Sequence, residues 1–297
     1  MATPGILLVD KPGGLTSHDV VARTRRAFGT RKVGHAGTLD PMATGLLVIG
    51  IEGATRLLTY IVGADKTYEA TIRLGAVTST DDAEGEILHT ADPAALVAVE
   101  DPAIDAGVAA LTGAISQVPS AVSAIKVDGR RAYDRVRAGE EVVLEPREVV
   151  VSRFDVLARR RDDHALDLDV VVDCSSGTYI RSLARDLGAA LGIGGHLTAL
   201  RRTRVGPFDV RDAVSIDALD TAPVLTPGEA AARVLPVLPV TADEARDLRH
   251  GKRLAGQAMR LDGPLAAAIE DDGALVGIVE KRGADVKSAM NMPEVSR

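Results

Sequence analysis

The segment GHAGTLDPMATGLL carries one carboxylate, Asp40, inside a glycine-rich loop. Gly34, Gly37 and Gly45 surround it and Pro41 follows it, so the backbone here can approach a bound molecule closely. An ionised carboxylate in such a loop can act as a nucleophile or as a general base. An Asp followed by a Pro is also typical of a helix start, with Asp40 as N-cap and Pro41 as the first helical residue. Residue chemistry alone favours this capping geometry, in which the helix N-terminus would help to keep the carboxylate ionised.

Arg181 is a charged residue in an otherwise apolar sector of a predicted helix. The pattern over residues 179–191 places apolar side chains at helical spacing on one stripe, and Arg181 projects beside that stripe. An unpaired buried charge is costly, so we expect Arg181 to have a buried acidic partner or to line a cleft.

Tyr68 and Tyr179 belong to a set of only seven aromatic residues, with no Trp. Residues 66–74 alternate polar and apolar side chains, which predicts a half-buried strand with the Tyr68 ring pointing inward. A buried Tyr is more often a core residue than a platform for a nucleic-acid base, unless it lines a cleft. Both roles stay open for these two tyrosines.

Other familiar chemistry has no support in the sequence. It contains no glycine-rich dinucleotide turn, no phosphate-binding loop ending in Gly-Lys-Ser/Thr, no Gly-x-Ser-x-Gly elbow, and no pair of histidines at metal-binding helical spacing. The single cysteine, Cys174, can form neither an internal disulfide nor a zinc site and is expected to be a buried small side chain. What remains is a reaction without metal or cofactor that uses carboxylate, tyrosine and arginine side chains.

The net charge of −7 argues against a nucleic-acid ligand until its distribution is considered. Residues 81–105 contain eight acidic residues and no basic ones, so the rest of the chain carries about +1. Basic residues concentrate at 11–32, 126–137 and 201–204. If these groups converge in space they form a phosphate-binding track; three ordinary solvated patches are the alternative.

The predicted elements indicate an α+β protein. Strands are expected at 66–74, 148–157 and 165–173, and helices at 54–62, 94–111, 131–137 and 179–191. The Pro- and Ala-rich stretch 221–239 is the best domain boundary. Beyond it we expect a small β-rich domain with a helix at 243–249, strands at 265–270 and 274–280, and a frayed tail from residue 287.

The absence of a long apolar run and of a signal-like N-terminus predicts a soluble, cytoplasmic protein with no membrane contact.

Six segments of the sequence resemble, in order, the bacterial tRNA pseudouridine-55 synthase family (TruB type). They cover about residues 5–208 and are KPGGLTSHDVV; RKVGHAGTLDPMATGLLVIGIEGATRL; KTYEATIRLG with TSTDDAEGE; VPSAVSAIKVDGRRAYDRVRAGEEV; SSGTYIRSLARDLG; and HLTALRRTRVGPF. The resemblance implies a pseudouridine synthase fold with a central mixed, mainly antiparallel sheet and an active cleft. It implies a catalytic domain at 1–222 with a basic RNA-clasping insertion at about 118–147, a linker at 223–239, and a PUA-like RNA-binding domain at 240–290.

The same resemblance implies catalytic roles at the matching positions. The Asp of the GTLDP segment, here Asp40, is the family's catalytic carboxylate. The Tyr of the K-x-Y strand, here Tyr68, stacks on the target uracil and is a candidate to act on its C5 proton. The Arg of YIRSLA, here Arg181, pairs with the catalytic Asp and would hold it ionised and oriented through charge-assisted hydrogen bonds.

Substrate-binding roles follow from the resemblance in the same way. Tyr179 and Leu200 are expected to flank the flipped base, His35 to take up space near the vacated stack, and Asp82 to join the Arg181 network. Lys11 lies in the KPGG segment, for which a supporting role is expected rather than a chemical one.

The implied reaction isomerises uridine 55 in the T loop of tRNA to pseudouridine after base flipping, with the tRNA T arm as partner and no obligate protein partner. Asp40 could attack C1′, attack C6 or remove a proton from C2′, and the sequence does not choose among these. Two rivals remain: a synthase of the same subfamily acting on another RNA, and a non-catalytic tRNA-folding chaperone that kept the fold.

Overall fold

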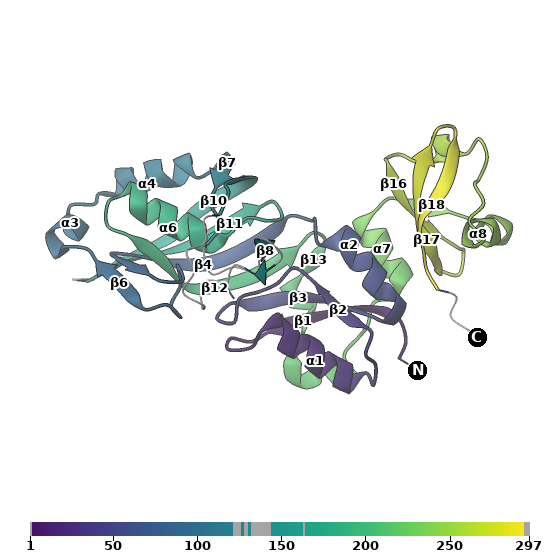
Figure 1. Ribbon diagram of the computed structural model, residues 1–297, viewed down its shortest axis with the longest axis horizontal. Helices are drawn as coiled ribbons and strands as arrows, with labels where there is room; N and C mark the ends of the chain where they lie inside the picture. Colours follow the sequence, from purple (N-terminus) through teal and green to yellow (C-terminus); the bar gives the residue numbers. More distant parts are fainter. Residues whose placement is uncertain (1, 121–125, 128–129, 132–143, 163, 294–297) are drawn as a thin grey trace. The chain divides into compact units, whose positions relative to one another are not determined.

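The computed structural model describes residues 2–120, 126–127, 130–131, 144–162 and 164–293 (Figure 1). The chain folds into two compact units. The first comprises residues 1–41, 45–63 and 205–297, and the second comprises residues 42–44 and 64–204. The helix predicted at 131–137 and most of the basic insertion predicted at 118–147 lie outside the described residues.

The first unit begins with a small mixed sheet. Strand β1 pairs antiparallel with β3 and parallel with β14, and β2 pairs antiparallel with β3. Apolar side chains of β1, β2, β3 and helix α1 form its core. Helix α1 begins with a capping box, in which Thr16 and Asp19 bond each other's backbone N–H groups. The elements here are β1 (Gly5–Lys11), α1 (Ser17–Ala27), β2 (Val33–Ala36), β3 (Thr44–Ile51), η1 (Glu52–Leu57), α2 (Leu58–Ile61), β13 (Phe208–Asp209), η2 (Val210–Asp212), β14 (Val214–Ser215), η3 (Ile216–Thr221) and α7 (Pro227–Val234).

The C-terminal part of this unit is a four-stranded sheet in the order β15-β16-β17-β18, with its own apolar core. The predicted β-rich C-terminal part is therefore confirmed. Its elements are β15 (Val237–Pro239), α8 (Ala242–Arg249), η4 (Ala258–Arg260), β16 (Leu265–Ile269), β17 (Leu275–Arg282) and β18 (Asp285–Asn291). The frayed tail predicted from residue 287 is wrong, because β18 pairs with β17 up to Asn291. The predicted linker contains α7 and β15, and the domain boundaries stay a prediction.

The second unit contains the neighbouring strands β12, β4, β11, β10 and β7. The β7–β10, β10–β11 and β11–β4 pairs are antiparallel. Its elements are β4 (Lys66–Leu74), β5 (Ala76–Thr78), β6 (Ile87–Thr90), α3 (Pro93–Val97), α4 (Asp101–Ala110), β7 (Gly113–Gln117), β8 (Lys126–Val127), β9 (Arg130–Arg131), β10 (Arg147–Arg161), β11 (Leu166–Cys174), α6 (Ile180–Ala190) and β12 (Gly195–Val205). The single helix predicted at 94–111 is two helices, because Pro102 near the start of α4 cannot continue a preceding helix.

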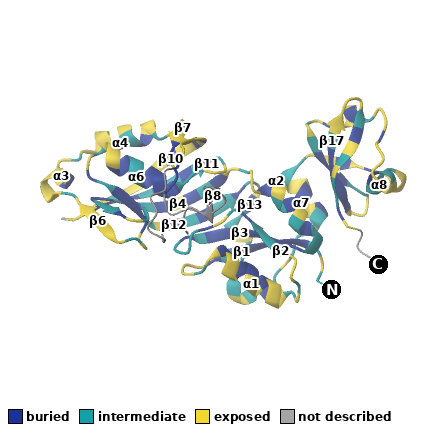
Figure 2. Cartoon of the chain, in the orientation of Figure 1, coloured by how far each residue is buried: buried dark blue, intermediate teal, exposed yellow. Residues whose placement is uncertain are grey.

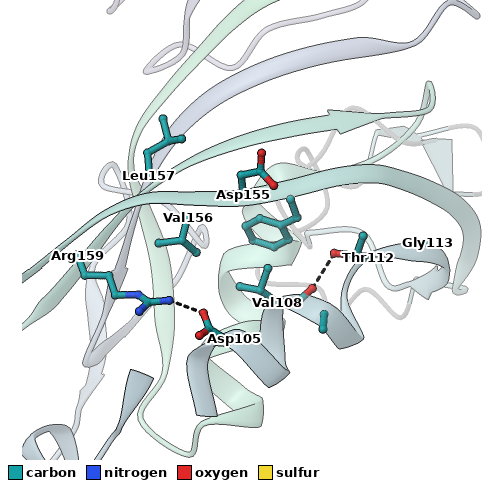
Figure 3. Close-up of a pocket in the computed structure, with 10 residues that line it drawn as sticks. Asp105, Val108, Thr112, Gly113, Asp155, Val156, Leu157 and Arg159 are labelled. Atoms are coloured by element: carbon teal, nitrogen blue, oxygen red, sulfur yellow. Dashed lines mark hydrogen bonds and ion pairs between the residues drawn. The ribbon is translucent and has the colours of Figure 1, made fainter. Parts of the chain in front are cut away.

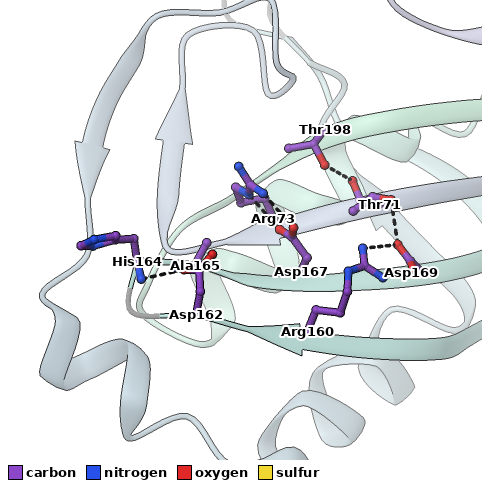
Figure 4. A network of polar contacts seen from close by, with 9 residues as sticks. All are labelled: Thr71, Arg73, Arg160, Asp162, His164, Ala165, Asp167, Asp169 and Thr198. Carbon is purple, nitrogen blue, oxygen red and sulfur yellow. Dashed lines mark hydrogen bonds and ion pairs between the residues drawn. The ribbon is translucent and has the colours of Figure 1, made fainter.

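The two faces of β4 and β11 have opposite character. Every second side chain of each strand is buried, and helix α6 packs near β4 while α4 packs near β10 (Figures 1 and 2). On the other face, Arg73 makes two hydrogen bonds to Asp167, of 2.8 and 2.7 Å. Next to this pair, Thr71 and Arg160 both donate to Asp169 (Figure 4). The expected alternation of 66–74 is confirmed, and the buried face is the one that carries Tyr68.

Helix α6 packs backbone against backbone with the start of β12. A Cβ atom at Gly188 would lie 2.2 Å from the carbonyl carbon of Gly194 and 2.2 Å from the nitrogen of Gly195. Gly188 therefore sets how closely α6 approaches this segment, and so where the first turn of α6, with Arg181, is held.

Gly188→Ala should lower the free energy of unfolding by about 1–3 kcal/mol, and with it the Tm, because the new methyl group overlaps backbone atoms that must move. Helix propensity alone predicts the opposite sign, since Ala is better than Gly by about 1 kcal/mol inside a helix. Thermal unfolding monitored by circular dichroism measures this, with Ala189→Gly at the exposed neighbouring position as the control for propensity. A rise in Tm for Gly188→Ala would contradict the packing argument.

Candidate active site

The first turn of α6 is held by a glutamine from β7. Gln117, 2% exposed, accepts a hydrogen bond from the Tyr179 N–H at 2.8 Å and donates to the Tyr179 carbonyl at 3.1 Å. Tyr179 is the N-cap residue of α6, and its side chain makes no capping bond. The Gln117 amide thus fixes the backbone from which the Tyr179 ring projects.

Arg181 is buried two residues further along, with only 3% of its surface exposed. Its Nη1 lies 3.6 Å from an Asp82 carboxylate oxygen, donates to the Thr80 carbonyl at 2.9 Å, and donates to the Ser120 Oγ at 3.2 Å. The expectation that a buried Arg181 requires a buried acidic partner is met by Asp82, which is 3% exposed. The low dielectric around this pair strengthens their attraction and makes either charge costly without the other.

The turn that carries Asp82 is itself tightly hydrogen-bonded. Thr80 Oγ1 and the Glu84 N–H donate to the Asp82 carboxylate, and Thr78 donates to the Asp82 carbonyl at 2.8 Å. Asp81 takes a positive φ of 59°, and burial raises the pKa of its carboxyl group, opposed by a hydrogen bond from Ser120 and by nearby arginine charge. The turn presents two acidic side chains toward the arginines of α6.

Asp40 is half-buried and lies in an irregular loop between β2 and β3. The predicted helix start is wrong, because residues 38–43 form no helix and the next element is strand β3. A Pro after an Asp also suits the extended or turn backbone that leads into a strand. Helix capping therefore does not account for this carboxylate.

Two hydrogen-bond clamps fix the backbone on either side of Asp40. The Ser17 Oγ, at the start of α1, accepts from the Leu39 N–H at 2.9 Å and bonds the Leu39 carbonyl at 3.2 Å. The Nζ of Lys11, a fully buried residue, donates to the Pro41 carbonyl at 3.2 Å and to the carbonyls of Pro12 and Leu15. Lys11 thus makes the structural contacts expected of a supporting residue.

The remaining predicted residues lie on strands. Tyr68 on β4 and Leu200 on β12 are each 7% exposed in the second unit. His35 lies on β2 in the first unit, where its ring meets that of His18 edge to face, with ring centroids 5.7 Å apart.

The structure brings some of the predicted residues together. Arg181 and Asp82 pair within the second unit, and Tyr179 lies two residues before Arg181, at the N-cap of α6. Asp40 belongs to the first unit, and its pairing with Arg181 stays a prediction.

The predicted phosphate-binding track loses two of its members. Lys11 and Arg202 are 0% and 1% exposed, so neither can reach a phosphate at the surface. Arg23, Arg25 and Arg26 are exposed on α1. The part of the second basic group at 132–137 lies outside the described residues.

Several residues of the site were not foreseen from the sequence. Gln117 and Ser120 contact residues of α6 and its N-cap that lie about sixty positions later in the sequence. Neither periodicity nor a local motif predicts contacts between residues so far apart. Lys66, two residues before Tyr68, is also buried and donates to the Ala64 carbonyl at 2.6 Å. Burial, followed by the charge of Arg202, lowers the pKa of Lys66 to about 8, so its amine stays mostly protonated at neutral pH.

A surface hollow of the second unit lies apart from these residues. It is formed between α4 and β10, and Asp105 and Arg159 form an ion pair at its rim (Figure 3). None of the seven predicted site residues lines it.

No helix in the described part of the chain is long and apolar enough to cross a membrane. Among the same residues, no group of three or more His, Cys, Asp or Glu side chains is placed to hold a metal ion.

Comparison with known proteins places the chain in a family. Residues 25–180 match the N-terminal domain of the TruB family pseudouridylate synthases. Residues 181–238 match the tRNA pseudouridylate synthase B C-terminal domain, and residues 235–293 match the C-terminal domain of tRNA pseudouridine synthase II. The chain belongs to the TruB family and is an isomerase of the pseudouridine synthase class.

Relatives cover nearly the whole chain. A protein of Leifsonia xyli named tRNA pseudouridine synthase B is 63% identical over 99% of this chain and 98% of its own length. A protein of the same name from Corynebacterium aurimucosum is 59% identical over 94% of this chain and 93% of its own length.

Solved structures confirm the α+β pseudouridine synthase fold. A chain from an H/ACA RNP bound to a substrate RNA containing 2′-deoxyuridine matches with a TM-score of 0.71 and 24% identity, covering 98% of this chain and 85% of that one. A chain from a Cbf5-Nop10-Gar1 complex matches with a TM-score of 0.69 and 24% identity, covering 98% and 84%. At this identity the likeness concerns the fold alone.

Asp82→Ala should destabilise the protein by about 3–5 kcal/mol, because it removes a buried carboxylate that lies 3.6 Å from the buried Arg181 guanidinium and offsets its charge. Asp105→Ala removes one of the two surface carboxylates that pair with Arg159, the other being Asp101, and should cost about 1 kcal/mol or less because the Asp105 side chain is 62% exposed. Urea unfolding of both variants beside the wild type measures the difference. Equal losses for the two variants would show that the Arg181–Asp82 pair is not the buried interaction described here.

Proposed function

We propose that this protein isomerises uridine 55 in the T loop of tRNA to pseudouridine, with Asp40 as the catalytic carboxylate and without a cofactor. The observation that carries the proposal is full-length similarity, at 63% and 59% identity, to relatives named tRNA pseudouridine synthase B. The six sequence segments quoted above support the uridine-55 branch of the family, and we place the activity in the cytoplasm.

The clamped loop supports a chemical role for Asp40. Ser17 holds the residue before Asp40 and Lys11 holds the residue after it, so the carboxylate projects from a backbone with little freedom. Pre-ordering a reacting group in this way removes an entropic cost from the reaction step. Attack at C1′, attack at C6 and proton removal from C2′ are the three roles that such a carboxylate can take.

Arg181 is proposed to orient and neutralise Asp40 when the substrate is bound. Its guanidinium is a planar fork with five donors, which can serve a second carboxylate as well as Asp82. A carboxylate beside this arginine stays ionised at neutral pH, as either a nucleophile or a base requires.

The proposed substrate contacts use side chains around Arg181 and Asp40. Tyr68 stacks on the target uracil, Tyr179 and Leu200 flank the flipped base, and His35 takes up space near the vacated stack. Extrusion of a base costs a few kcal/mol, which stacking and phosphate contacts offset.

The reaction balances without any co-reactant. The bond between uracil N1 and ribose C1′ breaks, the uracil turns within the pocket, and C1′ joins C5. The proton that leaves C5 is matched by the proton gained at N1, so no redox change and no group transfer to another molecule occurs.

RNA binding is proposed to involve three regions: the catalytic domain at 1–222, its basic insertion at 118–147, and the PUA-like domain at 240–290 after a linker at 223–239. The T arm is recognised by its folded shape and phosphate backbone more than by a long sequence. No protein partner is needed for this scheme.

Asp40→Asn should abolish pseudouridine formation while changing tRNA affinity by no more than a few fold, because the substitution keeps size and removes the ionisable group. Release of tritium from [5-³H]uridine-labelled tRNA transcripts measures product, and filter binding measures affinity. Turnover near the wild-type rate in Asp40→Asn would end the assignment of Asp40 as the catalytic carboxylate.

A transcript with uridine 55 replaced by cytidine should yield no pseudouridine with the wild-type enzyme, whereas the unchanged transcript should be modified at that position. Mapping pseudouridine by its carbodiimide adduct locates the product. Product elsewhere in the substituted transcript would favour the rival synthase acting on another site. Binding without product in either transcript would favour a non-catalytic chaperone.

A further inference from the structure

Three residues at and just after the end of β7, Gln117, Val118 and Ser120, attach this segment to α6 and its N-cap. The Gln117 amide bonds both backbone groups of Tyr179. The Val118 carbonyl accepts from the Arg185 Nη2 at 2.8 Å. The chain leaves β7 here as it enters the basic stretch, so these contacts fix its path beside α6.

Ser120 makes the contact that bears on Arg181. The Ser120 residue is 1% exposed, and its Oγ accepts from the Arg181 Nη1 at 3.2 Å, while its single proton faces the Thr80 carbonyl, 3.4 Å away, and the Asp81 carboxyl group. The same carbonyl accepts from the Arg181 Nη1 at 2.9 Å. Ser120, Thr80 and Arg181 therefore form a closed triangle of buried hydrogen bonds.

Asp82 and Ser120 contribute different things to Arg181. The Asp82 carboxylate lies 3.6 Å from Nη1, beyond the usual hydrogen-bond distance, so its main contribution is charge. The Ser120 hydroxyl carries no charge, but at 3.2 Å it is near enough to act as an acceptor of defined direction. Charge compensation holds an arginine in place, whereas acceptors at hydrogen-bond distance set the plane of its guanidinium, and here the Thr80 carbonyl and the Ser120 hydroxyl share the two N–H groups of Nη1.

We propose that Ser120 is a positioning residue for Arg181, whose hydroxyl fixes the orientation in which the guanidinium meets the catalytic carboxylate. This inference rests on the proposed function of Arg181. The inference assigns a role in orienting Arg181 to a residue at the start of the predicted basic insertion.

Ser120 is not needed to hold α6 itself. Ile180, Leu183 and Leu187 anchor the helix through its buried face, and Gln117 satisfies the N–H group at its start. Removal of the Ser120 hydroxyl should therefore leave the helix in place and change the direction of one side chain. A misplacement of this size near reacting atoms lowers the rate without weakening substrate binding in proportion.

The test is single-turnover pseudouridine formation by the full-length protein on a tRNA transcript, with the enzyme in saturating excess. Ser120→Ala should slow this step by roughly 10- to 100-fold and leave the Kd for the transcript within about twofold of wild type, the split expected when a transition-state interaction is lost. Ser120→Thr keeps the hydroxyl and should restore most of the rate. Ser116→Ala removes a hydroxyl from an exposed position of β7 and should leave the rate unchanged.

Three results would overturn the inference: an unchanged rate in Ser120→Ala, an equal loss of rate in Ser120→Thr, or a loss confined to the Kd. If Ser120→Ala does not fold, Ser120→Cys replaces it, because a thiol keeps the volume and is a weak hydrogen-bond acceptor. Wild-type protein that forms no pseudouridine would instead refute the proposed function. An active wild type with an equally active Ser120→Ala refutes only the role of Ser120.

Discussion

The buried Arg181 guanidinium is the constraint on which the described part of the candidate active site depends. A charge with 3% exposure must be matched by acceptors from other elements, and here they come from the turn at Thr80 and Asp82 and from Ser120. Each of these acceptors is in turn held by its own hydrogen bonds. One arginine thereby ties together α6, the turn after β5 and the end of β7.

Asp40 is fixed by a different principle. Side chains from outside the loop hold its backbone, because Ser17 bonds the main chain of Leu39 and Lys11 bonds the main chain of Pro41. Lys11 is a lysine used for its three N–H donors, with carbonyl oxygens as the partners, and not for a surface charge. The backbone on both sides of Asp40 is thus held by hydrogen bonds to its neighbours' main-chain groups.

Sequence periodicity was sufficient to predict strands in which polar and apolar side chains alternate strictly. The strand at 66–74 and the inward side of Tyr68 follow from a period of two, and the need of Arg181 for an acidic partner follows from the cost of a buried charge. Rules based on local sequence failed where the same short motif is compatible with more than one local structure. Asp-Pro at 40–41 suits a helix start and also a turn before a strand, and only the pairing of β3 with β1 decides between them.

Interactions distant in sequence were beyond such rules altogether. Gln117 meets Tyr179 because β7 pairs with β10 in one register, in which Gln117 lies opposite Arg147. A shift of one residue would turn the amide to the other side of the sheet. Register is a property of two strands together, so neither strand alone predicts the contact.

The row of paired charges on β4, β11 and β10 affects how strongly a polyanion binds this face of the sheet. Arg73 and Arg160 are engaged by Asp167 and Asp169, so a phosphate arriving at this face would have to displace a carboxylate that is already in place. The charges of Arg73 and Arg160 are therefore partly cancelled on this face by the two carboxylates that bind them. A phosphate gains less free energy beside arginines that are already paired than beside unpaired ones, so these ion pairs weaken non-specific binding of a polyanion to this face.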